Sequence, residues 1–401
     1  MTRLFALTAV LAAATSCQSY DLEPVNPLGL RTVHVTTAIT HLKARPDLML
    51  MVDKSGSMTL PINPADARCP AGCGPASPCP AGCPTRWTEL QAAMDGFLTR
   101  YGGVARMGLT QFAGPPPGLP SNTCVPGNVL VDTSNSNDVP AELMSTASQI
   151  NTVIAGIRPA QGTPTGPTLQ VLSSYAALDN PERDDYVLLL TDGLPNCNPN
   201  NPNTYRMNDP AAIAACRCTA TDPAVCDASG NQSCLDKDGT VSQLTTLSGK
   251  GVKTVVVGFG AETATGAGPE VLTAMGQAGG YTLTCPLGTD AECAGGTCNL
   301  ADQTCSNTYY QAGDRAALSA ALARLAETID PKPCEHKLPL EPSDPKFISV
   351  VVDGRSVPEG DDTWHYVPPQ TVNLVGSLCA RAEATTSLDP MDLSIGVIQT
   401  L

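Results

Sequence analysis

Residues 47–57 read Asp-Leu-Met-Leu-Met-Val-Asp-Lys-Ser-Gly-Ser, an apolar run that ends in a cluster of oxygen-bearing side chains. An uninterrupted apolar run is typical of a strand that is buried on both faces of a parallel sheet. Similar runs occur at 107–112, 186–190 and 252–259. We therefore expect these four segments to be the central strands of one sheet.

Helical patterns separate these strands along the chain. In the last pattern, Leu318, Leu322, Leu325 and Ile329 recur at the spacing of one helix face. The alternation of strands and helices predicts an α/β fold with a doubly wound, mostly parallel sheet. The expected helices cover residues 87–98, 141–157, 168–178, 269–278 and 314–329.

The pattern changes after Pro331-Lys-Pro333. Short strands are expected at 347–352, 364–367 and 371–375, with a turn at Asp353-Gly354 between the first two. No helical pattern follows residue 333. We therefore expect a separate, small β-rich domain at 333–401.

Composition limits the class of protein. The 401 residues carry 23 Lys and Arg against 38 Asp and Glu, a net charge of −15, which argues against nucleic acid as a partner. With 42% hydrophobic and 15% charged residues, the chain is too apolar to be disordered. Its length fits two or three domains. Seventeen cysteines indicate an oxidising compartment.

The first 16 residues have the features of an export signal. Arg3 precedes an apolar run at 4–14, which is too short to span a bilayer. The small residues before Cys17 resemble the lipobox of bacterial lipoproteins. That resemblance implies a lipid on Cys17 and, because Gln18 follows it, an outer-membrane protein exposed at the cell surface. The alternative is an ordinary secretory signal with a chance cysteine. Residues 17–45 would then be a tether with an N-terminal strand.

Oxygen-bearing side chains follow the predicted strands. Asp53, Ser55 and Ser57 come directly after the first strand, and Gly56 allows the backbone to turn tightly between them. The segment Gly162-Thr-Pro-Thr-Gly166 opens a helix, and Thr-Asp-Gly193 ends another strand. Loops that follow parallel strands meet at one edge of the sheet, where such folds bind ligands. Oxygen ligands suit a hard cation such as Mg²⁺.

This set resembles the von Willebrand factor type A domain, the family of the integrin inserted domain, over residues 46–332. The resemblance implies a metal-ion-dependent adhesion site that holds Mg²⁺ or Mn²⁺. It also implies that the cation recruits a carboxylate from a partner, which is recognition rather than catalysis. By resemblance the five metal ligands are Asp53, Ser55, Ser57, Thr163 and Asp192.

The cysteines fall mainly in the loops between the predicted elements. Cys69, Cys73, Cys79 and Cys83 have a spacing that fits two local disulfides or a zinc site, and export favours disulfides. We expect insertions after the parallel strands to form a stapled rim around the cation, whereas the insertion at 285–305 has no predicted side. The sixteen disulfide candidates are these four and Cys124, Cys197, Cys216, Cys218, Cys226, Cys234, Cys285, Cys293, Cys298, Cys305, Cys334 and Cys379.

The chain is therefore expected to be a cell-envelope adhesin, in surface adhesion or gliding motility, and it resembles adhesin lipoproteins of gliding myxobacteria. Its expected partners are a protein or substratum ligand that supplies a carboxylate and, through the lipid, the membrane. The alternative is a periplasm-facing docking module of an envelope complex. No catalytic motif such as HExxH or GxSxG occurs, so we expect no enzyme.

Overall fold

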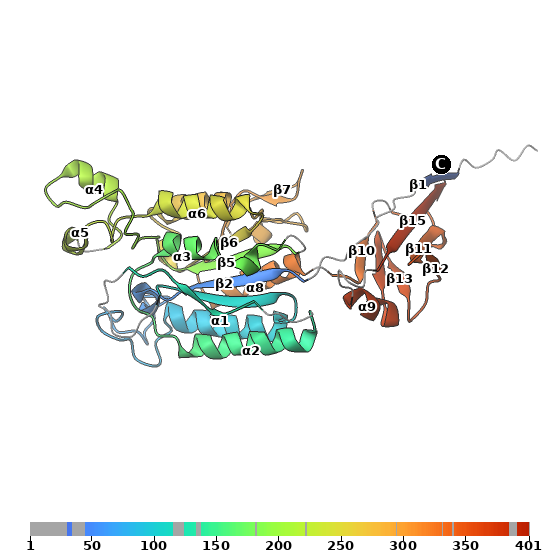
Figure 1. The fold of residues 1–401 in the computed structure, drawn as a ribbon, viewed down its shortest axis with the longest axis horizontal. Coiled ribbons are helices and arrows are strands. Elements are labelled where there is room, and N and C mark those ends of the chain that lie inside the picture. The colour runs from blue at the N-terminus through green and yellow to red at the C-terminus, as the bar shows by residue number, and fades with distance from the viewer. Residues whose placement is uncertain are drawn as a thin grey trace, which may run out of the picture.

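The computed structural model describes residues 30–33, 45–114, 124–133, 138–180, 183–220, 223–293, 295–330, 332–338, 341–384 and 391–400. It contains an α/β body and a smaller β-rich body (Figure 1). The expected signal segment and the lipidation site Cys17 lie outside these residues, as does most of the tether. Within the described segments, no helix is long and apolar enough to cross a bilayer.

The α/β body contains one six-stranded sheet. Every neighbouring pair is parallel except β3–β4, which is antiparallel. The prediction of a doubly wound, mostly parallel sheet is confirmed. In sheet order the strands are β4 (Asn128–Val131), β3 (Arg106–Phe112), β2 (Asp47–Asp53), β5 (Asp185–Thr191), β6 (Lys253–Phe259) and β9 (Tyr310–Ala312).

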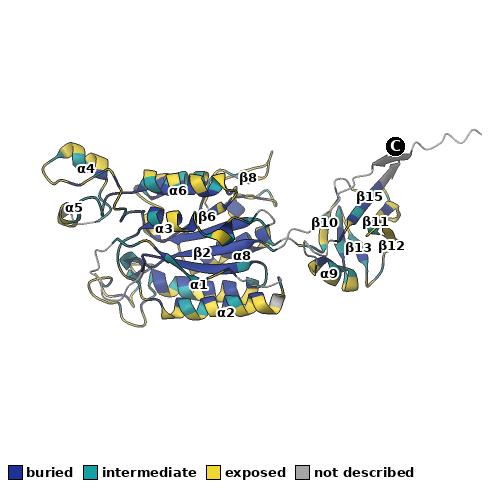
Figure 2. Cartoon of the chain, viewed as in Figure 1, coloured by how far each residue is buried: buried dark blue, intermediate teal, exposed yellow. Residues whose placement is uncertain are grey.

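Helices cover both faces of this sheet, which explains the continuous apolar run of β2. Leu48, Leu50 and Val52 pack on one face, and Met49 and Met51 pack on the other. All seven residues of β2 are buried, as the dark strands of Figure 2 show. The first face carries α1 (Arg86–Tyr101), α2 (Pro140–Gly156) and α8 (Arg315–Ile329); the second carries α3 (Thr165–Leu172), α6 (Lys237–Gly249) and α7 (Gly268–Gly279).

Most insertions follow the carboxyl ends of the parallel strands. Helices α4 (Pro210–Cys216) and α5 (Pro223–Ser229) come after β5 and extend from the left end of the body in Figure 1. The short helix η1 (Gly56–Thr59) follows β2, η3 (Ala261–Thr263) follows β6, and η2 (Ala176–Leu178) comes before β5. The insertions after the strands therefore surround the edge of the sheet where Asp53 lies.

The insertion at 285–305 lies on the opposite side of the body. It contains η4 (Asp290–Cys293), β7 (Cys298–Asn299) and β8 (Thr304–Cys305) and precedes β9, so it belongs to the amino edge of the sheet. The Glu292 carboxylate lies 3.1 Å from Nη1 of Arg324 on α8. This contact attaches the insertion to α8. The expected metal ligands lie at the other edge of the sheet, after the carboxyl ends of β2 and β5.

The described residues of the β-rich body form two small sheets, one α-helix and one short 3-10 helix. The first sheet has the order β1-β15-β11-β12 and the second β10-β14-β13. Their bounds are β1 (Leu30–Val33), β10 (Glu335–Lys337), β11 (Ile348–Val352), β12 (Arg355–Val357), β13 (Trp364–Val367), β14 (Thr371–Leu374) and β15 (Leu393–Thr400), with η5 (Pro345–Phe347) before β11.

Two features of this body differ from expectation. A helix, α9 (Gly376–Glu383), is present where none was predicted, because eight residues are too few to show a helical period. Cys379 on α9 is bonded to Cys334 at the entrance of the body. The tether strand β1 also pairs with β15, from Leu30–Thr400 to Val33–Val397. The β-rich body is therefore built from residues that come before the α/β body in the sequence as well as from residues that come after it.

Candidate metal centre

The candidate centre lies where the sheet order reverses. The chain runs outward from β2 to β3 on one side and continues through β5 on the other, and ligands of doubly wound folds bind at this point. Asp53 is the last residue of β2, and Asp192 directly follows β5. The sheet therefore brings together two carboxylates that are 139 positions apart by residue number.

Hydrogen bonds join four of the five predicted ligands into one chain. Asp53 Oδ1 accepts from the backbone N–H of Ser55 at 2.8 Å, and Asp53 Oδ2 accepts from Thr191 Oγ1 at 2.7 Å. The hydroxyl oxygens of Ser55 and Ser57 lie 2.9 Å apart. Ser57 Oγ then donates to Asp192 Oδ1 at 2.9 Å. Hydrogen bonds within the protein are thus enough to bring these carboxylates and hydroxyls together.

Thr163, the fifth predicted ligand, is fixed through its backbone. Its N–H donates to Asn196 Oδ1 at 2.7 Å, and its carbonyl accepts from the backbone N–H of Asn196 at 2.9 Å. Gly56 N–H donates to the Gln161 carbonyl at 2.9 Å, which ties this loop to the loop after β2. No hydrogen bond between the Thr163 hydroxyl and the other four ligands is seen among the described residues.

Burial governs the electrostatics of the centre. Asp53 and Asp192 are both 0% exposed. Burial raises the pKa of Asp53 to about 7, and the nearby charge of Asp192 adds to this, while bonds from Ser55 and Thr191 oppose it. Burial also raises the pKa of Asp192, against the attraction of Arg86. Two buried carboxylates need compensating positive charge, which a divalent cation would supply.

Arg86 is a residue of the centre that sequence reasoning missed. Its Nη1 donates to Asp192 Oδ2 at 2.7 Å, and its Nη2 donates to Glu262 Oε1 at 3.0 Å. It is the first residue of α1, and its backbone N–H donates to the Leu60 carbonyl at 3.0 Å. Nothing in the local sequence marks it, because its partners lie 106 and 176 positions away.

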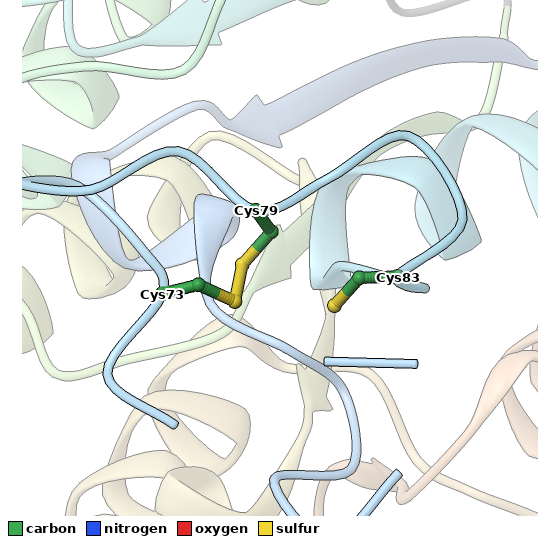
Figure 3. A group of neighbouring side chains, drawn as sticks. All are labelled: Cys73, Cys79 and Cys83. Atoms are coloured by element: carbon green, nitrogen blue, oxygen red, sulfur yellow. A yellow bond between two sulfur atoms is a disulfide. The ribbon is translucent and has the colours of Figure 1, made fainter. Parts of the chain in front are cut away.

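Among the described residues sixteen cysteines form eight disulfides, and one of these lies next to a residue that positions the Thr163 loop. Cys124 pairs with Cys197, which directly follows Asn196. Sulfur atoms of Cys73, Cys79 and Cys83 lie within 4.8 Å of one another, but all three are in disulfides and offer no thiolate for zinc (Figure 3). The remaining pairs are Cys69–Cys83, Cys73–Cys79, Cys216–Cys234, Cys218–Cys226, Cys285–Cys298, Cys293–Cys305 and Cys334–Cys379.

The donor set fits a hard divalent cation. The converging groups are carboxylate and hydroxyl oxygens, the ligands that Mg²⁺ and Mn²⁺ prefer, with no thiolate or imidazole among them. Asp53, Ser55, Ser57 and Asp192 are the residues placed to hold it, and the Thr163 loop lies beside them.

Fold and site together define an α/β protein of the doubly wound class with an oxygen-lined centre at the switch point of its sheet. No family model and no curated protein matches the chain. Among solved structures, the pilus adhesin SpaC from Lactobacillus rhamnosus GG is similar at a TM-score of 0.41 and 16% identity. The match covers 88% of this chain and 39% of that protein, so the chain spans well under half of its length.

Two further solved structures are similar to this chain at comparable scores. The von Willebrand factor domain of the type V pili tip protein Mfa5 from Porphyromonas gingivalis has a TM-score of 0.37 and 14% identity, over 72% of this chain and 95% of that one. The proximal thread matrix protein 1 of the mussel byssus, whose adhesion-site motif holds zinc, has a TM-score of 0.35 and 14% identity, over 74% and 50%.

Proposed function

We propose that this chain is a cell-envelope adhesin that binds an acidic group of its partner through a divalent cation. The observation that carries the proposal is the hydrogen-bonded chain from Asp53 through Ser55 and Ser57 to Asp192 at the switch point of the sheet. Such a cluster offers a cation two carboxylates and neutral hydroxyls. A divalent cation held partly by neutral hydroxyl oxygens keeps an affinity for a further carboxylate.

Each residue has a defined part in this proposal. Asp53 and Asp192 supply charge, Ser55 and Ser57 supply neutral oxygens, and Asn196 positions the Thr163 loop beside them. When bound, Mg²⁺ or Mn²⁺ would supply the positive charge that takes up the partner's carboxylate. The surrounding disulfides would keep the rim in one shape, so that little ordering entropy is lost when the partner binds.

The location of the adhesin is part of the same proposal. Cys17 would carry a lipid that holds the chain in the outer membrane, with the α/β body at the cell surface. The lipobox-like segment, the cysteine-rich insertions and the β-rich body together resemble the myxobacterial adventurous gliding motility adhesin lipoprotein. That resemblance supports a role in gliding, with a protein or substratum ligand as the partner.

Metal binding by the folded chain tests the proposal. Asp53→Asn keeps the shape of the side chain but removes the charge, so we expect Mn²⁺ affinity to fall by at least about tenfold in calorimetry. The matched control is Asp66→Asn, because Asp66 lies in the same loop but is paired with Arg68. Equal Mn²⁺ binding by wild type and Asp53→Asn would contradict the proposed site.

A further inference from the structure

Arg86 places a permanent positive charge directly against a predicted metal ligand. Its Nη1 lies 2.7 Å from Asp192 Oδ2, and its side chain is only 6% exposed. The guanidinium group does not lose its proton in proteins. A fixed cation opposes the binding of a second cation nearby, so Arg86 must influence how this centre takes a metal.

The guanidinium is held in this position by contacts on several sides. Nη2 bonds to Glu262 in the loop after β6, and the backbone N–H bonds to Leu60 after β2. A Cβ atom on Gly260 would come within 3.3 Å of Nε, so the strand end packs closely against the guanidinium. The guanidinium could move away from Asp192 only by breaking the hydrogen bond of Nη1 to Asp192 and that of Nη2 to Glu262.

A charge count shows what Arg86 does to a metal-loaded centre. The carboxylates of Asp53 and Asp192 neutralise a divalent cation, and Arg86 then leaves one positive charge in excess. Glu262 is half exposed, so water screens much of its charge. Lys54 is buried beside Asp53 and has the same sign as Arg86. Removing Arg86 would therefore take away one of two positive charges beside the carboxylates, the one bonded to Asp192.

We propose that Arg86 couples metal binding to anion binding. By keeping the metal-loaded centre positive, it makes the centre hold the cation weakly until a carboxylate of the partner joins it. Each ligand then raises the affinity of the other by the same factor. This inference rests on the proposed function, since it takes the divalent cation site as given. It adds that the requirement for an acidic partner comes from a residue outside the predicted ligand set.

The test measures Mn²⁺ affinity by calorimetry with and without acetate, which stands in for the partner's carboxylate. In the wild type, acetate should tighten Mn²⁺ binding by at least about threefold. Arg86→Met should bind Mn²⁺ alone about tenfold more tightly than wild type, because a competing charge is gone, and acetate should tighten its Mn²⁺ binding by less than in the wild type. Arg86→Lys, which keeps the charge, should behave as wild type.

The control is Arg68→Met, which removes an exposed arginine that pairs with Asp66 in the neighbouring loop. It should leave both measurements unchanged. A folded Arg86→Met variant that binds Mn²⁺ no more tightly, or whose acetate response is as large as that of the wild type, overturns the coupling. If Arg86→Met does not fold, the wild type still decides, since no tightening by acetate would also overturn it. Failure of the wild type to bind Mn²⁺ at all contradicts the proposed function instead.

Discussion

Two carboxylates lie opposite each other at the amino end of the central strands, far from the candidate metal centre. Asp47 and Asp185 are aligned in the β2–β5 register, and both are more than nine-tenths buried. Burial raises the pKa of Asp47 to about 6, against the attraction of Arg106. Burial and then the charge of Asp47 raise the pKa of Asp185 to about 7. Ionisation of this pair therefore costs free energy in the folded protein.

The pair should make the protein less stable as the pH rises. A carboxyl whose pKa is higher in the folded state binds its proton more tightly there, so its contribution is largest below about pH 4 and is lost towards about pH 7. Asp185→Asn cannot ionise, and we expect it to exceed wild type by about 1–2 kcal/mol in free energy of unfolding at pH 8, with little gain at pH 4.

Urea unfolding at both pH values measures this difference. The control is Asp95→Asn, because Asp95 is exposed on α1 and bonds to Asn151 at the surface. Its variant should follow the wild-type pH dependence. A pH-independent difference between Asp185→Asn and wild type would show that the buried pair does not titrate in this range.

At the scale of single elements, two helical glycines provide opposite tests of packing. A Cβ on Gly276 in α7 would lie 2.1 Å from the carbonyl oxygen of Thr308, which is backbone and cannot rotate away. A Cβ on Gly96 in α1 would meet no atom within 4 Å. The close approach at Gly276 brings α7 against the segment that leads into β9.

Alanine at these two positions should therefore change stability in opposite directions. Gly276→Ala should lower the free energy of unfolding by about 2–4 kcal/mol, because the backbone at Thr308 must move. Gly96→Ala should raise it by about 0.5–1 kcal/mol, the usual gain in an exposed helix interior. Thermal unfolding of both variants checks this, and a stabilising Gly276→Ala would contradict the packing of α7.

The elements that sequence alone could predict were those with a long, regular pattern. The strand beginning at Asp47 was predictable because burial on both faces demands an unbroken apolar run. Helix α6 was not predicted, because its buried face carries only two leucines, Leu244 and Leu247, together with the polar Thr240. Strand β9 has three residues, too few for any period.

The candidate site shows the same division. Asp53, Ser55 and Ser57 were found because their spacing is local and regular. Arg86 and Asn196 were missed because each acts through a partner that only the folded sheet brings close. Long-range contacts of this kind leave no periodic signal in one sequence, even when they fix the charge of the site.

At the scale of the whole molecule, orientation and anchoring of the proposed adhesin can be tested on cells. Cys17→Ser should release the protein from the membrane fraction into the soluble fraction, because no described helix could hold it there. Protease added to intact cells should remove the α/β body of the wild type. Protection in intact cells, with cleavage after the envelope is opened, would instead support the periplasm-facing docking module.

The position of β2 has a mechanical consequence. Its amino end at Asp47 continues towards the tether, and its carboxyl end at Asp53 enters the candidate metal centre. A partner that pulls on the bound cation would thus apply force to β2 along its axis. Strands β3 and β5 flank β2 and are both paired with it along its length. The hydrogen bonds on both sides would resist this tension in shear, together rather than one after another. The backbone from Asp47 to Asp53 would bear the load directly, without α8. The tether strand β1 is paired with β15, so the same load would also reach the β-rich body through that pairing.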